Sequence, residues 1–264
     1  MTTAASLFRV DGRVAFVSGA AGHLGRAMCE ALAEAGAHVI LNGRNEGRLK
    51  AFAGEMLARG HSVECAAFDV GDIAHVRALF GKLPRLDVLV NNAISMTPAQ
   101  FAQLEPAAFE QTYRSSVIAA FEAVRAALPA LRTGVREAGD ASVINVASMY
   151  AAVAPDARIY SKPEQASPAH YGAAKAALIQ LTRHVAAELG RENIRVNALV
   201  PGPFPRPEIT EADAEFANRL AGKTMLGRTG QAKEIRGPLL FLASGASSFV
   251  TGTALAVDGG WTAW

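Results

Sequence analysis

The chain of 264 residues has few cysteines and no long apolar run. Its two cysteines, Cys29 and Cys65, lie in segments typical of an ordinary helix and an ordinary strand, so a disulfide framework is not expected and a reducing compartment fits. No apolar stretch is long enough to span a bilayer, and the N-terminal segment MTTAASLFRVDGR lacks the apolar run of a signal peptide. We therefore expect a soluble cytoplasmic protein without a membrane partner.

The chain also lacks an excess of charge, because 26 basic residues nearly balance 24 acidic ones without a long block of either sign. This balance provides no basic stripe for nucleic acid and no patch for an anionic membrane. Half of the residues are hydrophobic, so the chain can bury a sizeable core, and its length fits one large α/β domain over residues 1–264. No metal site is expected.

Strand-like and helix-like segments alternate along the chain. The strand-like segments are apolar almost without alternation, which is typical of strands buried on both faces. They span residues 13–19, 38–43, 62–70, 86–93, 142–148, 194–202 and 254–260. Helical patterns span residues 25–35, 46–59, 72–83, 106–131, 170–189 and 231–243. This order predicts a doubly wound (Rossmann) parallel sheet of about seven strands flanked by helices, which binds ligands at the carboxyl ends of its strands.

A glycine-rich turn, SGAAGHLGRA, follows the first predicted strand and places Gly19, Gly22 and Gly25 at the start of a helix. Glycines there let the backbone turn tightly and approach a pyrophosphate, which binds the free N–H groups and the positive dipole end of the helix. Such turns also exist only to close a bend. The place of this one, between the first strand and an amphipathic helix, favours dinucleotide binding.

The second predicted strand ends in LNGRN, with Arg44 at its tip. Proteins that select NAD usually carry an acid there, whereas an arginine can pair with the extra phosphate of NADP. We therefore expect NADP(H) to be preferred and NAD(H) to be possible; the alternative is a solvated surface arginine. Asp69 could accept from the adenine amine or cap a helix, and Asn91 and Asn92 could face the cofactor or form a turn.

The segment YSKPEQASPAHYGAAK holds two pairs of tyrosine and lysine. Tyr160 and Lys162 are two residues apart and lie near prolines, which disfavours a shared helix face. Tyr171 and Lys175 are four residues apart in a strongly helix-forming segment, so their side chains share one face. Ser148, at the end of the fifth predicted strand, should reach the same edge of the sheet.

Together with SGAAGHLG, FDV, NNA, VNALVPG and TGTALAVDGG, these residues resemble the short-chain dehydrogenase/reductase family along nearly the whole chain. The resemblance implies hydride transfer between a nicotinamide ring and an alcohol or ketone carbon. It implies that Tyr171 is the acid/base, that Ser148 polarises the substrate oxygen, and that Lys175 holds the nicotinamide ribose. Lys175 and the oxidised ring should also lower the phenol pKa from about 10. Further residues implied in cofactor binding are His23, Leu24, Gly25, Val70, Asn92, Ala93, Pro201, Gly202 and Phe204.

Four positions depart from the family pattern. His23 and Ile94 stand where the family usually has glycine, and Arg206 falls near a threonine that normally touches the cofactor. Ser116 occupies the place of an asparagine that supports a water chain from the lysine. It is the candidate for that relay, although a serine has a different reach.

Two irregular segments that follow strands should border the substrate. Residues 151–169 are predicted to form an inserted loop, because the 23 residues that separate Ser148 from Tyr171 exceed the family spacing. The second irregular stretch spans residues 201–210, and residues 201–224 are predicted to form a substrate lid. Arg158 and Tyr160 could touch substrate, although packing within the loop is favoured for both. His170 is expected to be a residue of the helix start.

We therefore predict hydride transfer between NADP(H) and a small hydroxy or keto compound, with a sugar acid or polyol favoured. The segment VILNGRNEGRL resembles gluconate 5-dehydrogenases, and the overall pattern resembles 3-oxoacyl carrier-protein reductases. The alternatives are an NAD-linked sugar or alcohol dehydrogenase, a 3-oxoacyl thioester reductase, and a cofactor-sensing scaffold without turnover, which retention of Ser148, Tyr171 and Lys175 disfavours. The resemblance also implies a homo-oligomer, a tetramer or a dimer.

Overall fold

Seven parallel strands form one sheet in the computed structural model, which describes residues 3–162 and 166–264. The strands are β1 (Val14–Val17), β2 (His38–Gly43), β3 (Val63–Ala67), β4 (Val88–Asn91), β5 (Ala141–Val146), β6 (Ile194–Pro201) and β7 (Ala254–Val257). Their order across the sheet is β3-β2-β1-β4-β5-β6-β7, so the chain winds outward in both directions from the β1–β4 pair. The predicted doubly wound sheet is confirmed, and each predicted strand segment contains a strand.

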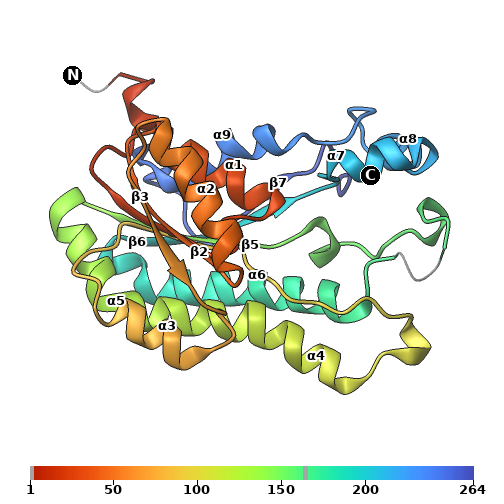
Figure 1. Cartoon of the computed structure of the whole chain (residues 1–264), viewed down its shortest axis with the longest axis horizontal. Coiled ribbons are helices and arrows are strands. Elements are labelled where there is room, and N and C mark those ends of the chain that lie inside the picture. Colours follow the sequence, from red (N-terminus) through yellow and green to blue (C-terminus); the bar gives the residue numbers. More distant parts are fainter. Residues whose placement is uncertain (1–2, 163–165) are drawn as a thin grey trace.

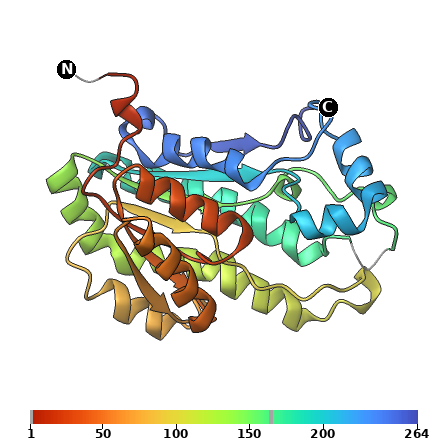
Figure 2. The same cartoon turned by 45° about the horizontal axis from the view of Figure 1, so that its top comes forward.

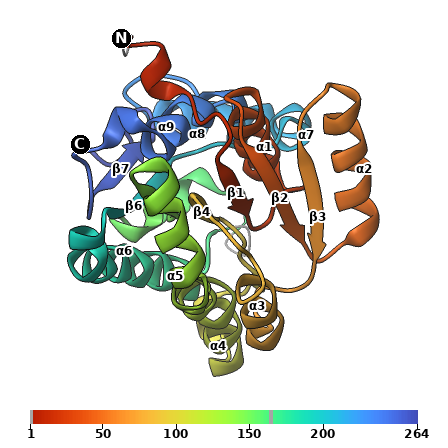
Figure 3. The ribbon, with the colours of Figure 1, turned by 90° about the vertical axis from the view of Figure 1, so that its left-hand side faces the viewer.

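Helices cover both faces of the sheet (Figures 1 and 3). One face carries α1 (His23–Glu34), α2 (Glu46–Ala58) and α9 (Arg236–Ala243). The opposite face carries α3 (Ile73–Phe80), α5 (Ala119–Ala138) and α6 (Ala169–Leu189). A separate apolar core lies against each face, with Phe52 fully buried in the first and Phe80 in the second. Within the described residues no helix has both the length and the apolar character needed to cross a bilayer.

The helix predicted over residues 106–131 is interrupted. It consists of α4 (Pro106–Tyr113), a π-helical turn (Arg114–Ile118) and α5, which continues to Ala138. The hydroxyl groups of Ser115 and Ser116 donate to the Thr112 carbonyl oxygen over 3.3 and 2.6 Å. Side-chain hydrogen bonds of this kind compete with the backbone ladder and accommodate the wider turn. The prediction of one continuous helix is therefore wrong.

Two short helices, α7 (Pro207–Ala212) and α8 (Ala214–Gly222), occupy most of the segment predicted as a lid. Pro207 is the first residue of α7, where its missing N–H and fixed φ are tolerated. The Asp213 carboxylate accepts from the Phe216 N–H over 2.8 Å and caps α8. The expectation of irregular chain over residues 201–210 is therefore wrong from Pro207 onward.

The two edge strands differ from the inner strands in burial. Neither β3 nor β7 contains a fully buried residue, whereas every residue of β5 and β6 is buried. An edge strand has a neighbour on one side only, so fewer side chains cover it. Burial on both faces, which was expected of every strand, is therefore wrong for these two.

The carboxyl ends of the strands point to one end of the molecule. Figure 2 shows α7, α8, the segment after β5 and the start of α6 gathered there. The parallel register places the end of β4 beside the ends of β1 and β5, since Val90 pairs with Val17 and Asn91 with Asn145. Residues that follow different strands thereby meet at one edge.

Candidate functional site

The turn after β1 brings three glycines to the start of α1. Gly19 has a φ of +67°, a conformation that favours glycine, and a Cβ there would lie 2.9 Å from the Asn92 amide nitrogen. A Cβ on Gly25 would lie 2.1 Å from the Gly19 carbonyl oxygen, so only glycine lets α1 begin this close to the turn. Gly22 is the N-cap, and no side chain caps the helix. The first turn of α1 therefore offers backbone N–H groups to an anion.

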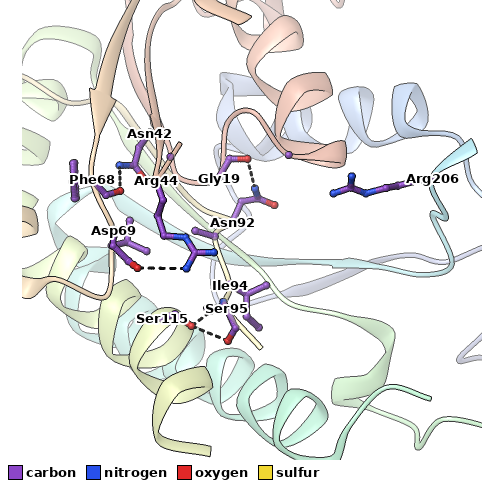
Figure 4. Close-up of a pocket in the computed structure, with 14 residues that line it drawn as sticks. Gly19, Asn42, Arg44, Phe68, Asp69, Asn92, Ile94, Ser95, Ser115 and Arg206 are labelled. Carbon is purple, nitrogen blue, oxygen red and sulfur yellow. Dashed lines mark hydrogen bonds and ion pairs between the residues drawn. The ribbon is translucent and has the colours of Figure 1, made fainter. Parts of the chain in front are cut away.

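A cavity of about 300 Å³ opens in front of this turn (Figure 4). Seven predicted cofactor residues line it: Gly19, Gly22, Arg44, Asp69, Val70, Asn92 and Ala93. Seven other residues complete the lining: Asn42, Gly43, Phe68, Ile94, Ser95, Ser115 and Arg206. The cavity therefore joins the ends of β1, β2, β3 and β4.

At the far end of this cavity Arg44 meets an acid. Its guanidinium lies 3.6 Å from the Asp69 carboxylate, and both side chains are well exposed. The tip of β2 itself carries no acid, as expected, but the neighbouring strand supplies one. Asp69 also accepts from the Gly71 N–H over 2.8 Å, so it shapes the turn after β3 as well as pairing with Arg44.

The two asparagines that close β4 hold neighbouring strands together. The Asn92 amide donates to the Ser18 carbonyl oxygen over 2.9 Å, and the Asn92 N–H donates to the Ser18 hydroxyl over 2.9 Å. The Asn91 amide donates to Asn145 on β5 over 2.9 Å. Asn92 thus holds the start of the glycine turn through Ser18. Asn91 instead bonds the neighbouring strand and does not line the cavity.

Ser148, Tyr171 and Lys175 meet where β5 ends and α6 begins. The Ser148 oxygen accepts from the Tyr150 N–H over 3.2 Å, which leaves its own proton to be donated. The Ser148 hydroxyl is near enough to the Tyr171 phenol to act on its pKa. The Lys175 ammonium lies 5.7 Å from the centre of the Tyr171 ring and donates to the Val146 carbonyl oxygen over 2.5 Å. One strand end and one helix face therefore assemble the three side chains.

Burial shifts the pKa values of Tyr171 and Lys175. It raises the pKa of Tyr171, and the hydrogen bond from Ser148 opposes the change in part. Burial also lowers the pKa of Lys175 to about 8, because the ammonium is almost removed from water. In the protein by itself desolvation prevails and favours the protonated phenol. The expected lowering of the phenol pKa by Lys175 together with the oxidised ring stays a prediction.

Comparisons with known proteins agree with this geometry. A family model described as enoyl-(acyl carrier protein) reductase matches residues 19–262. Gluconate 5-dehydrogenase from Gluconobacter oxydans is 34% identical over 263 residues, which cover 97% of each chain. The chain belongs to the short-chain dehydrogenase/reductase family. Its named relatives are dehydrogenases and reductases that act on CH–OH groups, and the chain is an enzyme of this NAD(P)-dependent class.

Two further relatives extend this assignment. Galactitol 2-dehydrogenase from Cereibacter sphaeroides is 34% identical over 264 residues, and the match covers 98% of each chain. The solved structure of a gluconate 5-dehydrogenase from Burkholderia cenocepacia J2315, in complex with NADP and tartrate, matches with a TM-score of 0.86 and 33% identity. That likeness covers 99% of this chain and 100% of the other.

The residues present in this short-chain dehydrogenase/reductase fit a dinucleotide. The uncapped start of α1, the glycine cradle and the cationic Arg44 suit a chain of phosphates. The Nε2 atom of His23, the first residue of α1, is buried without a hydrogen-bond partner among the described residues. Burial, followed by the charge of Arg206, lowers the pKa of His23, which keeps this imidazole neutral near pH 7.

The structure does not bring every family-implied residue to the cavity lining. Leu24 packs against the core under α1, and Gly25 serves the close approach described above. Gly202 lies against Asp258, where a Cβ would come within 2.4 Å of the Asp258 Cα. Phe204 lines a different cavity, of about 400 Å³, with Gly230 and the chain after β7. From this loop it is Arg206 that reaches the dinucleotide cavity.

Ser116, the candidate for the family's relay position, lies in the π-helical turn. Its hydroxyl donates to the Thr112 carbonyl oxygen over 2.6 Å, so its proton is used within its own helix. No hydrogen bond joins Ser116 to Tyr171 or Lys175 within residues 3–162 and 166–264. The geometry therefore offers only the lone pairs of Ser116 to a water molecule.

The loop predicted over residues 151–169 is hydrogen-bonded to α8, which lies in the segment predicted as a lid. The Arg219 side chain on α8 donates to the Ile159 carbonyl oxygen over 2.6 Å and to the Ser161 hydroxyl over 2.8 Å. Lys223 lies 3.1 Å from the Asp156 carboxylate, and the rings of Tyr160 and Phe216 are 5.8 Å apart. Residues 163–165 of the predicted loop lie outside the described residues. The remainder of the loop and α8 form one connected wall at the carboxyl edge.

Arg158 and Tyr160 behave differently within this wall. Arg158 is exposed and pairs with Asp156 over 2.7 Å, as expected of packing within the loop. Tyr160 is half-buried, and its hydroxyl lies 2.7 Å from that of Tyr150. Tyr150 is close enough to Tyr171 for a charge on one phenol to raise the pKa of the other. No pattern indicated Tyr150; its one signal was its place two residues after Ser148.

His170 is a buried residue of the α6 start. Its Nδ1 atom lies 3.0 Å from the Thr112 hydroxyl on α4, and its Nε2 atom lies 3.1 Å from the Thr97 carbonyl oxygen. Nε2 faces a carbonyl oxygen, so it carries a proton and donates to Thr97, while Nδ1 faces the Thr112 hydroxyl, which also donates to the Ser95 carbonyl oxygen over 3.1 Å. The imidazole thus ties α6, directly before Tyr171, to two segments that follow β4. The sequence placed His170 correctly but gave no sign of these partners.

Proposed function

We propose that the protein transfers a hydride between NADP(H) and the carbinol or carbonyl carbon of a small hydroxy or keto compound. The observation that supports this most is the meeting of Ser148, Tyr171 and Lys175 at the sheet edge that also carries the dinucleotide cavity. A bound nicotinamide would supply or accept the hydride. The protein's own groups hold the substrate oxygen and move its proton.

The proton chemistry follows from the hydrogen bonds of the trio. Because the Ser148 oxygen accepts from the Tyr150 N–H, its proton is available to a substrate oxygen as well as to Tyr171. Burial keeps the Tyr171 phenol protonated, which suits the donation of a proton during carbonyl reduction. Lys175 places a cationic donor beneath the phenol ring, where it can hold a ribose hydroxyl.

The test of this assignment is Tyr171→Phe. The variant retains the ring that packs beside Lys175 but lacks the proton, so turnover should fall by about 10³-fold or more while NADPH affinity stays within about twofold. Turnover follows the absorbance of the reduced nicotinamide, and affinity follows its fluorescence. Normal turnover in the variant would remove Tyr171 as the acid.

The preference for NADP(H) rests on Arg44. Its guanidinium lines the cavity at the β2 tip, where it can pair with a phosphate on the adenine ribose. Its exposed contact with Asp69 is long, so a phosphate can replace or share it at small cost. The solved relative that contains NADP adds support. Arg44→Ala should weaken NADPH binding about tenfold more than NADH binding, and equal losses in titrations of both would defeat this assignment.

A sugar acid or polyol is the proposed substrate class. The relatives named gluconate 5-dehydrogenase and galactitol 2-dehydrogenase act on such compounds according to their names. In this chain the paired hydroxyls of Tyr150 and Tyr160 lie near Tyr171 and can bond a polyhydroxy chain. We assign the wall of the substrate site to residues 151–169 and 201–224. A screen of sugar acids, polyols and keto esters with both nicotinamide cofactors tests the class, and activity confined to keto esters would refute it.

We further propose that the enzyme acts in the cytoplasm as a homo-oligomer, a tetramer or a dimer. The helices after β4 leave Phe109, Ile118 and Phe121 exposed, which gives a second copy an apolar surface. Sedimentation of the wild type and of Phe121→Glu tests this. A wild type that sediments as a monomer would contradict it.

A further inference from the structure

Arg206 is a cation at the edge of the dinucleotide cavity and has no side-chain partner in the described part of the chain. It lines that cavity together with Gly19 and Gly22, and its exposed guanidinium forms no hydrogen bond or ion pair with the residues described. Figure 4 shows its side chain directed toward the glycine turn, on the other side of Gly19 and Asn92 from Arg44. The cavity is therefore bracketed by two arginines.

The local backbone fixes where Arg206 presents its side chain. It stands between Pro205 and Pro207 and has φ −70° and ψ 143°, the extended conformation that a following proline enforces. Pro207 then begins α7. Because both flanking prolines restrict the chain, little backbone entropy is lost when the guanidinium binds a ligand.

The surroundings of Arg206 favour an anion. Its charge lowers the pKa of His23, so the two side chains lie close together at the start of α1. Glu208 acts on His23 in the opposite direction, but it forms no ion pair with Arg206 among the described residues. The positive end of the α1 dipole, the uncapped N–H groups and the free guanidinium thus converge on one part of the cavity.

We propose that Arg206 binds the pyrophosphate of the dinucleotide, while Arg44 binds the phosphate on the adenine ribose. This inference rests on the proposed function. The guanidinium can donate two parallel N–H bonds to a phosphate, which a hydroxyl side chain at this position cannot do. The two arginines match the two phosphate groups of NADP(H), and the glycine turn lies between them.

The same contact links the cofactor to the substrate wall. Arg206 is the N-cap of α7, and α8 follows after a single residue and is bonded to the inserted loop through Arg219 and Lys223. A pyrophosphate held by Arg206 would therefore lie at the start of the segment that carries α7 and α8.

Two fragments separate the roles of the arginines by calorimetry. 2′-Phospho-ADP-ribose carries both phosphate groups, whereas adenosine 2′-monophosphate lacks the pyrophosphate. Arg206→Ala should weaken binding of the first by about tenfold and leave the second within about twofold, since a charge-assisted hydrogen bond is lost only where a pyrophosphate exists. Arg44→Ala should weaken both. Arg206→Lys, which keeps the charge but not the fork, should fall between the wild type and Arg206→Ala.

Arg191→Ala is the matched control, because this exposed arginine precedes β6 at the opposite edge of the sheet. It should leave both affinities unchanged. Unchanged binding of 2′-phospho-ADP-ribose by Arg206→Ala would overturn the inference, and so would equal losses for both fragments, which would indicate a general field effect. A wild type that binds neither fragment would instead refute the proposed function, and the inference with it.

Discussion

Replacing Lys175 by methionine should stabilise the fold while it abolishes turnover. The side chain is only 3% exposed, and the Val146 carbonyl oxygen is its one hydrogen-bond partner among the described residues. Burial lowers the pKa of this lysine from 10.5 to about 8. The folded protein therefore disfavours the charged form that the unfolded chain holds freely, and methionine fills a similar volume without a charge.

The magnitude follows from the difference between the two pKa values. Because the folded pKa of Lys175 lies below the unfolded value, the unfolded state binds more protons between pH 8 and 10.5, and stability rises with pH across that window. Below pH 8 the full cost applies, about 3 kcal/mol at pH 7. Loss of the hydrogen bond to Val146 costs about 1 kcal/mol. The net gain for Lys175→Met is about 2 kcal/mol, or roughly 4–8 °C in Tm.

Urea unfolding of the protein without nucleotide measures this gain at pH 7 and again at about pH 9.5, where the cost of burying the lysine falls to roughly half. Lys82→Met is the control, since that side chain is exposed and its loss should change stability by less than about 0.5 kcal/mol. A destabilised Lys175→Met variant would show that the carbonyl contact outweighs desolvation. A gain that does not shrink with pH would show that the charge is not its source.

Arg219→Ala should alter substrate choice more than nucleotide affinity, because it frees Ile159 and Ser161 from α8; kcat/KM values for several sugar acids, with the Kd for NADPH, check this, and an unchanged substrate profile would contradict it. His170→Ala should lower the free energy of unfolding by about 1–3 kcal/mol, because two buried hydrogen bonds are lost, and urea unfolding with Lys82→Met as control measures it. Carbonyl reduction should persist to high pH and alcohol oxidation should rise with pH, because the raised pKa of Tyr171 retains the proton that reduction needs; rate profiles in both directions would show the opposite trends if the phenol were ionised.

Regularities that repeat along the chain made the fold predictable. Each inner strand is an apolar segment bounded by turn residues, and each crossover helix has its own apolar stripe, so the alternation alone indicated the sheet. Gly19 and Gly25 were also recognisable, because their conformation or close approach excludes other residues. The spacing of Tyr171 and Lys175 was sufficient to predict that their side chains lie side by side, because a helix places residues four apart on one face.

The helical details of α4 and α7 could not be predicted in the same way. Ser115 and Ser116 are compatible with a helix, and the π-helical turn forms because their hydroxyls find the Thr112 carbonyl oxygen nearby. The prolines before α7 indicated irregular chain, yet Pro207 is the residue that begins the helix. A serine can either continue a regular helix or bond a backbone carbonyl, and a proline can either interrupt a helix or begin one. The neighbouring residues decide between these outcomes.

Pairings between segments far apart in the sequence set the limits of prediction at the site. Arg44 and Asp69 each had a plausible separate role, and only the adjacency of β2 and β3 makes them neighbours. The role of Arg206 was equally hard to predict. Its position in the chain matches a threonine of the family, but the ligand it can bind depends on the cavity that its side chain lines. The path of a loop therefore decides which ligand a charged side chain on that loop can reach, and the path between Pro205 and Pro207 brings Arg206 to the cavity in front of the glycine turn.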